Sequence, residues 1–298
     1  MRLRLWSVVS AMVDAKAVGS IPTGRSITGG SFVSRKKTIY VIIMLFLGAG
    51  ILFCGGAIKM GQMMDEENKQ LYSGYTAPAE ISGEEIDAEA EYLPVQVDWN
   101  SLRKKNNEVV GWVWVDADSE ADVISYPVMC RAEDRDYYLR HNIGKQYSKY
   151  GTPYIPGDYD LDGKVVSIHG HNFGSDAETM FSPLVKYQEK DYATRHPVIW
   201  YGEVGENVQQ YKIFSVMEYD CAPLDTGEDC WDYLQTDFGS DEEYAEWLAE
   251  AKARSLFEIG EMPSSEAQVV ILSTCETAKA TSVRCVVFAY REVISDGS

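Results

Sequence analysis

Residues 268–293 read QVVILSTCETAKATSVRCVVFAYREV. Two apolar runs, 268–275 and 283–293, flank a polar stretch in this segment, and their richness in Val is typical of β-strands. Eight residues separate Cys275 from Arg284, which is short enough for a loop between neighbouring antiparallel strands. If the two strands pair, the thiol and the guanidinium can project from the same rim of a sheet.

Earlier strand-like runs in the chain predict the rest of the fold. They are rich in Val, Ile, Tyr and Trp, several alternate apolar with polar residues, and turn residues separate them. They cover residues 109–117, 122–129, 152–157, 164–172, 197–202 and 208–220. Eight runs within about 190 residues predict a mainly β fold with peripheral helices, closed into an eight-stranded barrel that leaves no exposed edges.

Three helices are expected around this barrel, two short ones and a longer one over 240–256. Asp98 can cap a helix over 99–107, and 180–187 is expected to form another. Ser240 and Glu243 make a capping box for a third helix. Its apolar residues recur at helical spacing and predict a stripe packed on the barrel: Tyr244, Trp247, Leu248 and Ala251.

Charge is distributed unevenly along the 298 residues, whose formal net charge is −19. Residues 1–60 carry eight Lys or Arg and one acid, whereas the rest carry 19 Lys or Arg against 45 Asp or Glu. A basic N-terminal segment followed by an acidic remainder indicates that the two parts of the chain lie in different compartments. The acidic body excludes nucleic acid as a partner, because phosphate binding needs clustered cations.

Residues 38–58 contain no charged side chain. As a helix these 21 residues would span roughly 30 Å, the hydrocarbon thickness of a bilayer. Arg35, Lys36 and Lys37 precede them, so we expect a single-pass cell-membrane protein with its N-terminus inside. A cleaved signal peptide is the alternative.

These features suggest four regions. Residues 1–37 are expected to be a cytoplasmic tail, or to precede the true start of the protein. The membrane anchor at 38–58 is followed by an acidic stalk over 59–97, which is poor in large apolar residues. Residues 98–298 are expected to form the extracytoplasmic catalytic domain.

Cys275 and Arg284 are the first candidates for chemistry. Cys275 ends an apolar strand, although a single buried Cys is more often a small core hydrophobe. Arg284 opens an apolar strand, where a charge is costly unless it is paired or faces water. A surface ion pair would be the ordinary explanation of this arginine. Cys285 should point to the opposite face from Arg284.

Two of the four histidines, His169 and His171, flank Gly170 at the end of a strand-like run. This spacing also suits a metal pair, but no further ligand is evident from the sequence. His141 and His196 have polar neighbours and are expected on the surface.

A cysteine, a histidine and an arginine together suit acyl transfer. Only the thiolate is a strong nucleophile, and an ordinary Cys has a pKa of about 8.5. An imidazole can take the thiol proton and later donate one to a leaving amine. A guanidinium stabilises the negative charge that develops on the attacked carbonyl oxygen.

At these residues the chain resembles the class B sortases. Their signature is a Thr-Cys pair at a strand end, an Arg about nine residues later, and an earlier Gly-His-Asn tripeptide; here these are Thr274-Cys275, Arg284 and Gly170-His171-Asn172. Further matching segments include GWVWV, DVISYPVM, MFSPLVKY, HPVIWY and YKIFSV, and the resemblance covers roughly residues 92–293.

The resemblance implies a sortase-type barrel and a cysteine transpeptidase that needs neither metal nor cofactor. Cys275 would attack the Thr carbonyl of a C-terminal sorting motif in a secreted protein, forming a thioacyl-enzyme. An amine of the peptidoglycan cross-bridge or its precursor, in a Gram-positive cell wall, would resolve it. His171 would be the acid–base partner and Arg284 the positive charge. Substrate-binding positions carried over are Leu139, His169, Ser273, Thr274 and Glu276; Arg135 stands where Asn is common.

Two alternatives use the same sequence features. A cysteine peptidase would resolve the thioester with water instead of an amine. A membrane-anchored surface binding module without catalysis would also fit the acidic stalk and the Tyr- and Trp-rich barrel.

Overall fold

The computed structural model describes one of the two units into which the chain divides, Met1–Met60 and Gly61–Ser298. All described residues belong to the second unit. They are 63, 67, 68, 70–78, 95–157, 163–174, 179–206, 208–222, 231–275 and 282–293.

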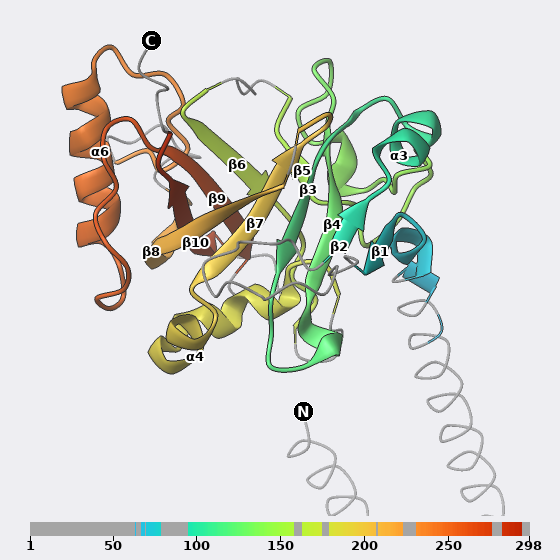
Figure 1. Cartoon of the computed structure of the whole chain (residues 1–298), viewed down its shortest axis with the longest axis horizontal. Helices are drawn as coiled ribbons and strands as arrows, with labels where there is room; N and C mark the ends of the chain where they lie inside the picture. The colour runs from blue at the N-terminus through green and yellow to red at the C-terminus, as the bar shows by residue number, and fades with distance from the viewer. Residues whose placement is uncertain are drawn as a thin grey trace, which may run out of the picture. The chain divides into compact units, whose positions relative to one another are not determined.

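Eight strands form a closed barrel at the centre of this unit (Figure 1). Their order around the barrel is β10-β8-β7-β3-β4-β5-β6-β9. The predicted eight-stranded β-barrel is therefore confirmed. The strands are β3 (Val109–Val115), β4 (Ile124–Cys130), β5 (Tyr154–Ile155), β6 (Val165–His169), β7 (Val198–Glu203), β8 (Gln209–Asp220), β9 (Gln268–Cys275) and β10 (Val283–Arg291).

Two parallel pairings distinguish the barrel from a simple meander. β4 pairs with β5 and β6 pairs with β9 in parallel, whereas the other neighbouring strands are antiparallel. Parallel neighbours need long crossover connections. Because of the β6–β9 pairing, segments about a hundred residues apart in sequence lie side by side.

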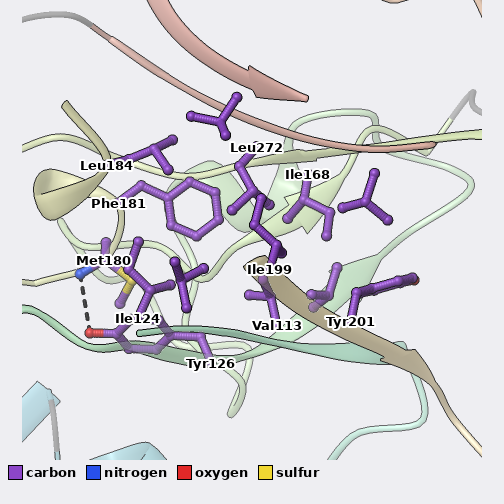
Figure 2. Packing of buried hydrophobic residues seen from close by; sticks show 14 of the residues in the cluster. Val113, Ile124, Tyr126, Ile168, Met180, Phe181, Leu184, Ile199, Tyr201 and Leu272 are labelled. Atoms are coloured by element: carbon purple, nitrogen blue, oxygen red, sulfur yellow. Dashed lines mark hydrogen bonds between the residues drawn. The ribbon is translucent and has the colours of Figure 1, made fainter. Parts of the chain in front are cut away.

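The strands alternate between two apolar clusters. Leu272 and Val287 point into the barrel, where Figure 2 shows Leu272 near Ile168. Ile271 and Phe288 belong to a second cluster on the outer face. This outer cluster also contains Tyr244, Trp247, Leu248 and Ala251 of α6 (Asp241–Ala253), so the predicted apolar stripe is the surface that α6 buries.

Helix capping follows the sequence closely. The Asp98 carboxylate accepts a hydrogen bond from the Ser101 amide at the start of α3 (Trp99–Lys105). The Ser240 hydroxyl accepts one from the Glu243 amide at the start of α6, while the Glu243 carboxylate accepts from the Gly239 amide. The remaining short elements are η1 (Glu120–Asp122), η2 (Tyr137–Leu139), η3 (Ser182–Gln188) and α4 (Lys190–Arg195).

The described residues just before α3 pack on the barrel. Residues 70–73 are helical, and β1 (Thr76–Pro78) pairs with β2 (Val95–Val97). Tyr72 is 1% exposed and Asn68 is 6% exposed. In this part of the region predicted as a solvated stalk, the chain therefore contributes buried side chains to the folded unit.

The expected single-pass membrane localisation is corrected by the structure. Among the residues that it describes, no helix has the length and apolar character needed to cross a bilayer. The proposed span itself, residues 38–58, and the tail before it lie outside the described residues.

Candidate active site

The register of β9 and β10 places Cys275 directly opposite Arg284. Directly opposite residues of an antiparallel pair project to the same face, with Cβ atoms about 4.5–5.5 Å apart. Both residues lie near strand ends, Cys275 as the last residue of β9 and Arg284 as the second of β10. The chain therefore presents a thiol and a guanidinium together at one rim of the barrel.

Alternation along β10 separates the two nearby cysteines. Cys285 is fully buried in the cluster inside the barrel, and its thiol contacts the Leu184 carbonyl oxygen at 3.5 Å. Cys275 is half-buried and lies on the opposite face. The prediction that Cys285 faces away from Arg284 is confirmed.

The parallel pairing of β6 with β9 brings the Gly-His-Asn segment to the same rim. His169, the last residue of β6, is opposite Ser273. The Gly170 amide donates to the Ser273 carbonyl at 3.1 Å, and the Thr274 hydroxyl donates to the Gly170 carbonyl at 2.8 Å. These bonds fix the point at which the chain leaves β6 and enters the loop carrying His171.

Asn172 ties this loop directly to the candidate nucleophile. Its side-chain amide nitrogen donates to the Cys275 carbonyl oxygen at 2.8 Å, and its side-chain oxygen accepts from the Gly174 amide at 2.7 Å. The sequence motif includes Asn172, but nothing in the sequence revealed this contact. Asn172 therefore links the backbones of the histidine loop and the cysteine strand.

A pocket of about 720 Å³ opens at this rim. Cys275, His171 and Arg284 all line it. So do four of the five predicted substrate-binding residues: Leu139, His169, Ser273 and Thr274. The fifth, Glu276, lies outside the described residues. The structure thus brings residues from three separate parts of the sequence to one cavity, and their catalytic and binding roles stay predictions.

The His171 ring is held by a backbone carbonyl. Its Nε2 atom lies 2.9 Å from the Leu139 carbonyl oxygen at the end of η2. A carbonyl can only accept a hydrogen bond, so Nε2 carries the proton in the neutral ring. That leaves the lone pair on Nδ1 for proton exchange. Leu139 therefore acts on the site through its backbone as well as through its place in the pocket.

Burial favours the neutral form of both pocket histidines. It lowers the pKa of His171, an effect that the Leu139 carbonyl opposes and the Arg140 charge reinforces. Burial, together with the positive charges of Arg135 and Arg284, lowers the pKa of His169 to about 4. His169 is therefore an uncharged group at neutral pH, with its Nε2 atom 3.1 Å from the Ser167 hydroxyl.

The hydroxyl groups of Ser273 and Thr274 are engaged within the protein. Both residues are 2% exposed. Ser273 hydrogen-bonds the Tyr233 hydroxyl at 3.1 Å, and Thr274 bonds Gly170 as described. With their hydroxyl groups bonded within the protein, Ser273 and Thr274 shape the pocket wall mainly through their packing.

Sequence reasoning missed two aromatic contributors to the pocket. Tyr233, from the segment before α6, and Tyr154 of β5 both line the cavity. The Tyr154 hydroxyl donates to the Asp136 carboxylate at 3.0 Å. The sequence signal is weak, because 19 tyrosines are scattered along the chain and only the fold selects these two.

The expectation that His196 lies on the surface is wrong. His196 is 7% exposed, and its Nε2 atom lies 3.0 Å from the Asp118 carboxylate. His141 is half-buried and stacks on the Tyr137 ring at 3.8 Å. Neither histidine is among the residues that line the site pocket.

The alternative of a metal held by His169 and His171 lacks further ligands in the described part of the chain. No three His, Cys, Asp or Glu side chains there are grouped as a metal site would require. Two imidazoles alone make a poor structural or catalytic site, which usually has at least three protein ligands.

We expect Gly151→Ala to weaken the positioning of His171. Gly151 has φ +64°, and a Cβ atom there would lie 2.5 Å from the Tyr138 carbonyl oxygen and 2.6 Å from that of Leu139. The backbone must shift, and the carbonyl that holds His171 shifts with it. Thermal unfolding should show a loss of about 3 kcal/mol in unfolding free energy, combining backbone strain with the clash.

Gly205→Ala is the matched control for this substitution. Gly205 also has a positive φ, +93°, but nothing lies within 4 Å of the added Cβ. It should lose only the strain contribution, about 1 kcal/mol. Equal losses in the two variants would contradict the role assigned to the carbonyl contact.

Known proteins similar to this chain include sortases of two Gram-positive bacteria and a solved structure with a related fold. No family model matches it. Sortase B of Listeria monocytogenes is 29% identical over 84% of this chain and 92% of its own length. Sortase B of Staphylococcus aureus is 24% identical over 86% of this chain and 97% of its own length. The solved Staphylococcus aureus sortase B–substrate complex matches with a TM-score of 0.55 and 25% identity, covering 66% of this chain and 86% of that one.

The barrel and these relatives together define an enzyme, a cysteine transpeptidase of the sortase type. Among the sortases, the chain is similar to those of class B.

Proposed function

We propose that the enzyme cleaves a sorting motif near the C-terminus of secreted proteins after its Thr residue and transfers the new acyl end to a cell-wall amine. One observation carries this proposal: Cys275 is opposite Arg284 in the β9–β10 register, and both line a single pocket with His171. These are the three groups that acyl transfer through a thiol requires.

The first half of the reaction forms a thioester. The Cys275 thiol gives its proton to Nδ1 of His171, the ring atom left free by the Leu139 carbonyl, and the sulfur attacks the Thr carbonyl carbon. The C–N bond of the scissile peptide breaks, and His171 returns the proton to the departing amine. The products are a thioacyl-enzyme and the released C-terminal fragment.

In the second half of the reaction an amine enters, whereas in the first half an amine departs. The incoming amine attacks the thioester carbon while His171 accepts its proton. The C–S bond breaks, the sulfur recovers the proton, and a new amide joins the two substrates. No net oxidation or reduction takes place, so no cofactor is needed.

Arg284 supplies charge stabilisation in both halves. Each tetrahedral intermediate places a negative charge on the former carbonyl oxygen, and a guanidinium remains positive at any relevant pH. The charge of Arg284 lowers the pKa of His169, so its field reaches across the pocket.

Substrate contacts are proposed for Leu139, His169, Ser273, Thr274 and Glu276. The first four line the pocket, and the uncharged His169 suits a neutral polar group of the motif. The solved structure of Staphylococcus aureus sortase B as a complex with its substrate supports substrate binding by this chain.

Capture of an added amine tests this function. The enzyme would be incubated with a peptide carrying an Asn-Pro-x-Thr-Asn-like or Pro-Pro-x-Thr-Gly-like motif, with and without triglycine, and the products identified by mass spectrometry. We expect a new amide between the Thr carboxyl group and triglycine. Cleavage that yields only the free Thr carboxylate, at any triglycine concentration, would favour the peptidase alternative.

A further inference from the structure

The segment before α3 contacts the loops that surround His171. It contains two nearly fully buried polar side chains, Asn68 and Tyr72. Polar groups are costly to bury unless they are hydrogen-bonded. The partners of these two residues belong to the two loops that flank His171.

Tyr72 contacts the loop that supplies the carbonyl for the His171 ring. Its hydroxyl lies 3.0 Å from the Thr152 hydroxyl, and the Ile143 backbone also hydrogen-bonds it. Thr152 in turn donates through its hydroxyl to the His141 carbonyl at 3.0 Å and through its amide to the Tyr138 carbonyl at 2.9 Å.

These bonds enclose Leu139. The carbonyls of Tyr138, just before Leu139, and of His141, two residues after it, both accept from Thr152. The Thr152 hydroxyl uses its single proton on His141, so Tyr72 must be the donor to it. The Leu139 carbonyl, which accepts from His171, therefore lies in a turn that Tyr72 helps to hold.

Asn68 contacts the other side of the histidine loop. Its side-chain amide donates to the Thr179 hydroxyl at 3.1 Å, and Thr179 is 1% exposed. Thr179 also lies 3.4 Å from the Tyr126 hydroxyl, which accepts a hydrogen bond from the Met180 amide, drawn as a dashed line in Figure 2. The next amide, that of Phe181, donates to the His171 carbonyl at 2.9 Å.

The two sets of contacts meet at one aromatic pair. The rings of Tyr72 and Tyr126 pack edge to face with centroids 5.4 Å apart. One set of bonds then leads to the His171 ring through Leu139, and the other leads to the His171 backbone through Phe181.

We propose that Asn68 and Tyr72 are positioning residues that hold His171 in its reactive orientation. Tyr72 stabilises the turn whose Leu139 carbonyl binds the His171 ring, and Asn68 stabilises the segment whose Phe181 amide binds the His171 carbonyl. This inference rests on the proposed role of His171 in catalysis. The segment before the barrel would then influence the reaction although neither Asn68 nor Tyr72 contacts the substrate.

Nuclear magnetic resonance of the histidine rings in the full chain tests the bracing directly. The chain has only four histidines, and a His171→Gln variant assigns the His171 signal. We expect exchange of its Nε2-bound proton with solvent to accelerate about tenfold or more in the Asn68→Ala/Tyr72→Phe double variant, because that hydrogen bond opens more often.

Ser73→Ala is the matched control. Ser73 lies beside Tyr72 but is exposed, and its hydroxyl bonds the Gln70 carbonyl of its own turn at 3.3 Å. Ring exchange in this variant should equal that of the unaltered chain.

With a motif peptide and triglycine, the Asn68→Ala/Tyr72→Phe double variant should lose about tenfold in kcat with little change in KM, since orientation and not binding is affected.

The ring measurement separates this inference from the proposed function, since it needs no turnover. Unchanged ring exchange in the double variant would overturn the bracing role. So would a uniform acceleration of amide exchange across all barrel strands, because the two residues would then serve stability alone. If the unaltered chain showed no transfer activity, the proposed function would be refuted, whereas the result of the ring measurement would still stand.

Discussion

Replacing Cys275 with Ala is expected to abolish cleavage of a sorting-motif peptide while the domain stays folded. The sulfur is the only group proposed to bond covalently to substrate, so its removal should reduce turnover by at least about 10⁴-fold. The side chain is half-buried at a strand end, and its truncation should cost no more than about 1 kcal/mol. Peptide turnover and thermal unfolding measure the two effects.

Cys285→Ala is the control for this substitution. Its thiol is fully buried inside the barrel, one position along β10 from Arg284. Truncation there should lower the unfolding temperature through a small cavity, yet leave catalysis largely intact. Turnover by the Cys275→Ala protein at the rate of the unaltered enzyme would exclude a thiol mechanism.

Arg284→Lys should reduce kcat by about 10²–10³-fold, although the charge is retained. A lysine ammonium is a point charge on a flexible stem and cannot reproduce the planar fork that a guanidinium offers to an oxyanion. Since the interaction is made mainly in the transition state, kcat and kcat/KM should fall together. Steady-state kinetics with a motif peptide measure both.

The same change at the far end of the strand provides a comparison. Arg291, the last residue of β10, donates to the Gln268 side chain at 3.1 Å and lies over the Tyr211 ring. It is not among the residues lining the site pocket. Arg291→Lys should keep near-normal kinetics. If Arg284→Lys kept them too, Arg284 would have no place in the reaction.

Local patterns predicted the elements of this fold well. The stripe of Tyr244, Trp247, Leu248 and Ala251 is buried on α6 as its spacing indicates. Cys275 and Arg284 could be paired because only a short loop joins their strands. In both cases the deciding interactions lie within a few residues or between consecutive strands, and sequence spacing carries that information.

Interactions between distant segments were not predictable in this way. The β6–β9 pairing depends on how the whole barrel closes, and no periodicity encodes it. His196 was misjudged because its partner, Asp118, lies 78 positions earlier in the chain. Asn68 and Tyr72 stand in a region whose acidic, apolar-poor composition suggests solvent exposure, and only their three-dimensional partners make them core residues.

The parallel pairing of β6 with β9 also sets the order in which the enzyme can mature. As the polypeptide is synthesised, the loop with His171 emerges about a hundred residues before the strand whose carbonyl and hydroxyl groups fix it. Such non-local contacts form late and slow down folding. A nascent chain that has not yet released β9 and β10 would hold the candidate imidazole without the candidate nucleophile, so the proposed site can assemble only after the last two strands have emerged.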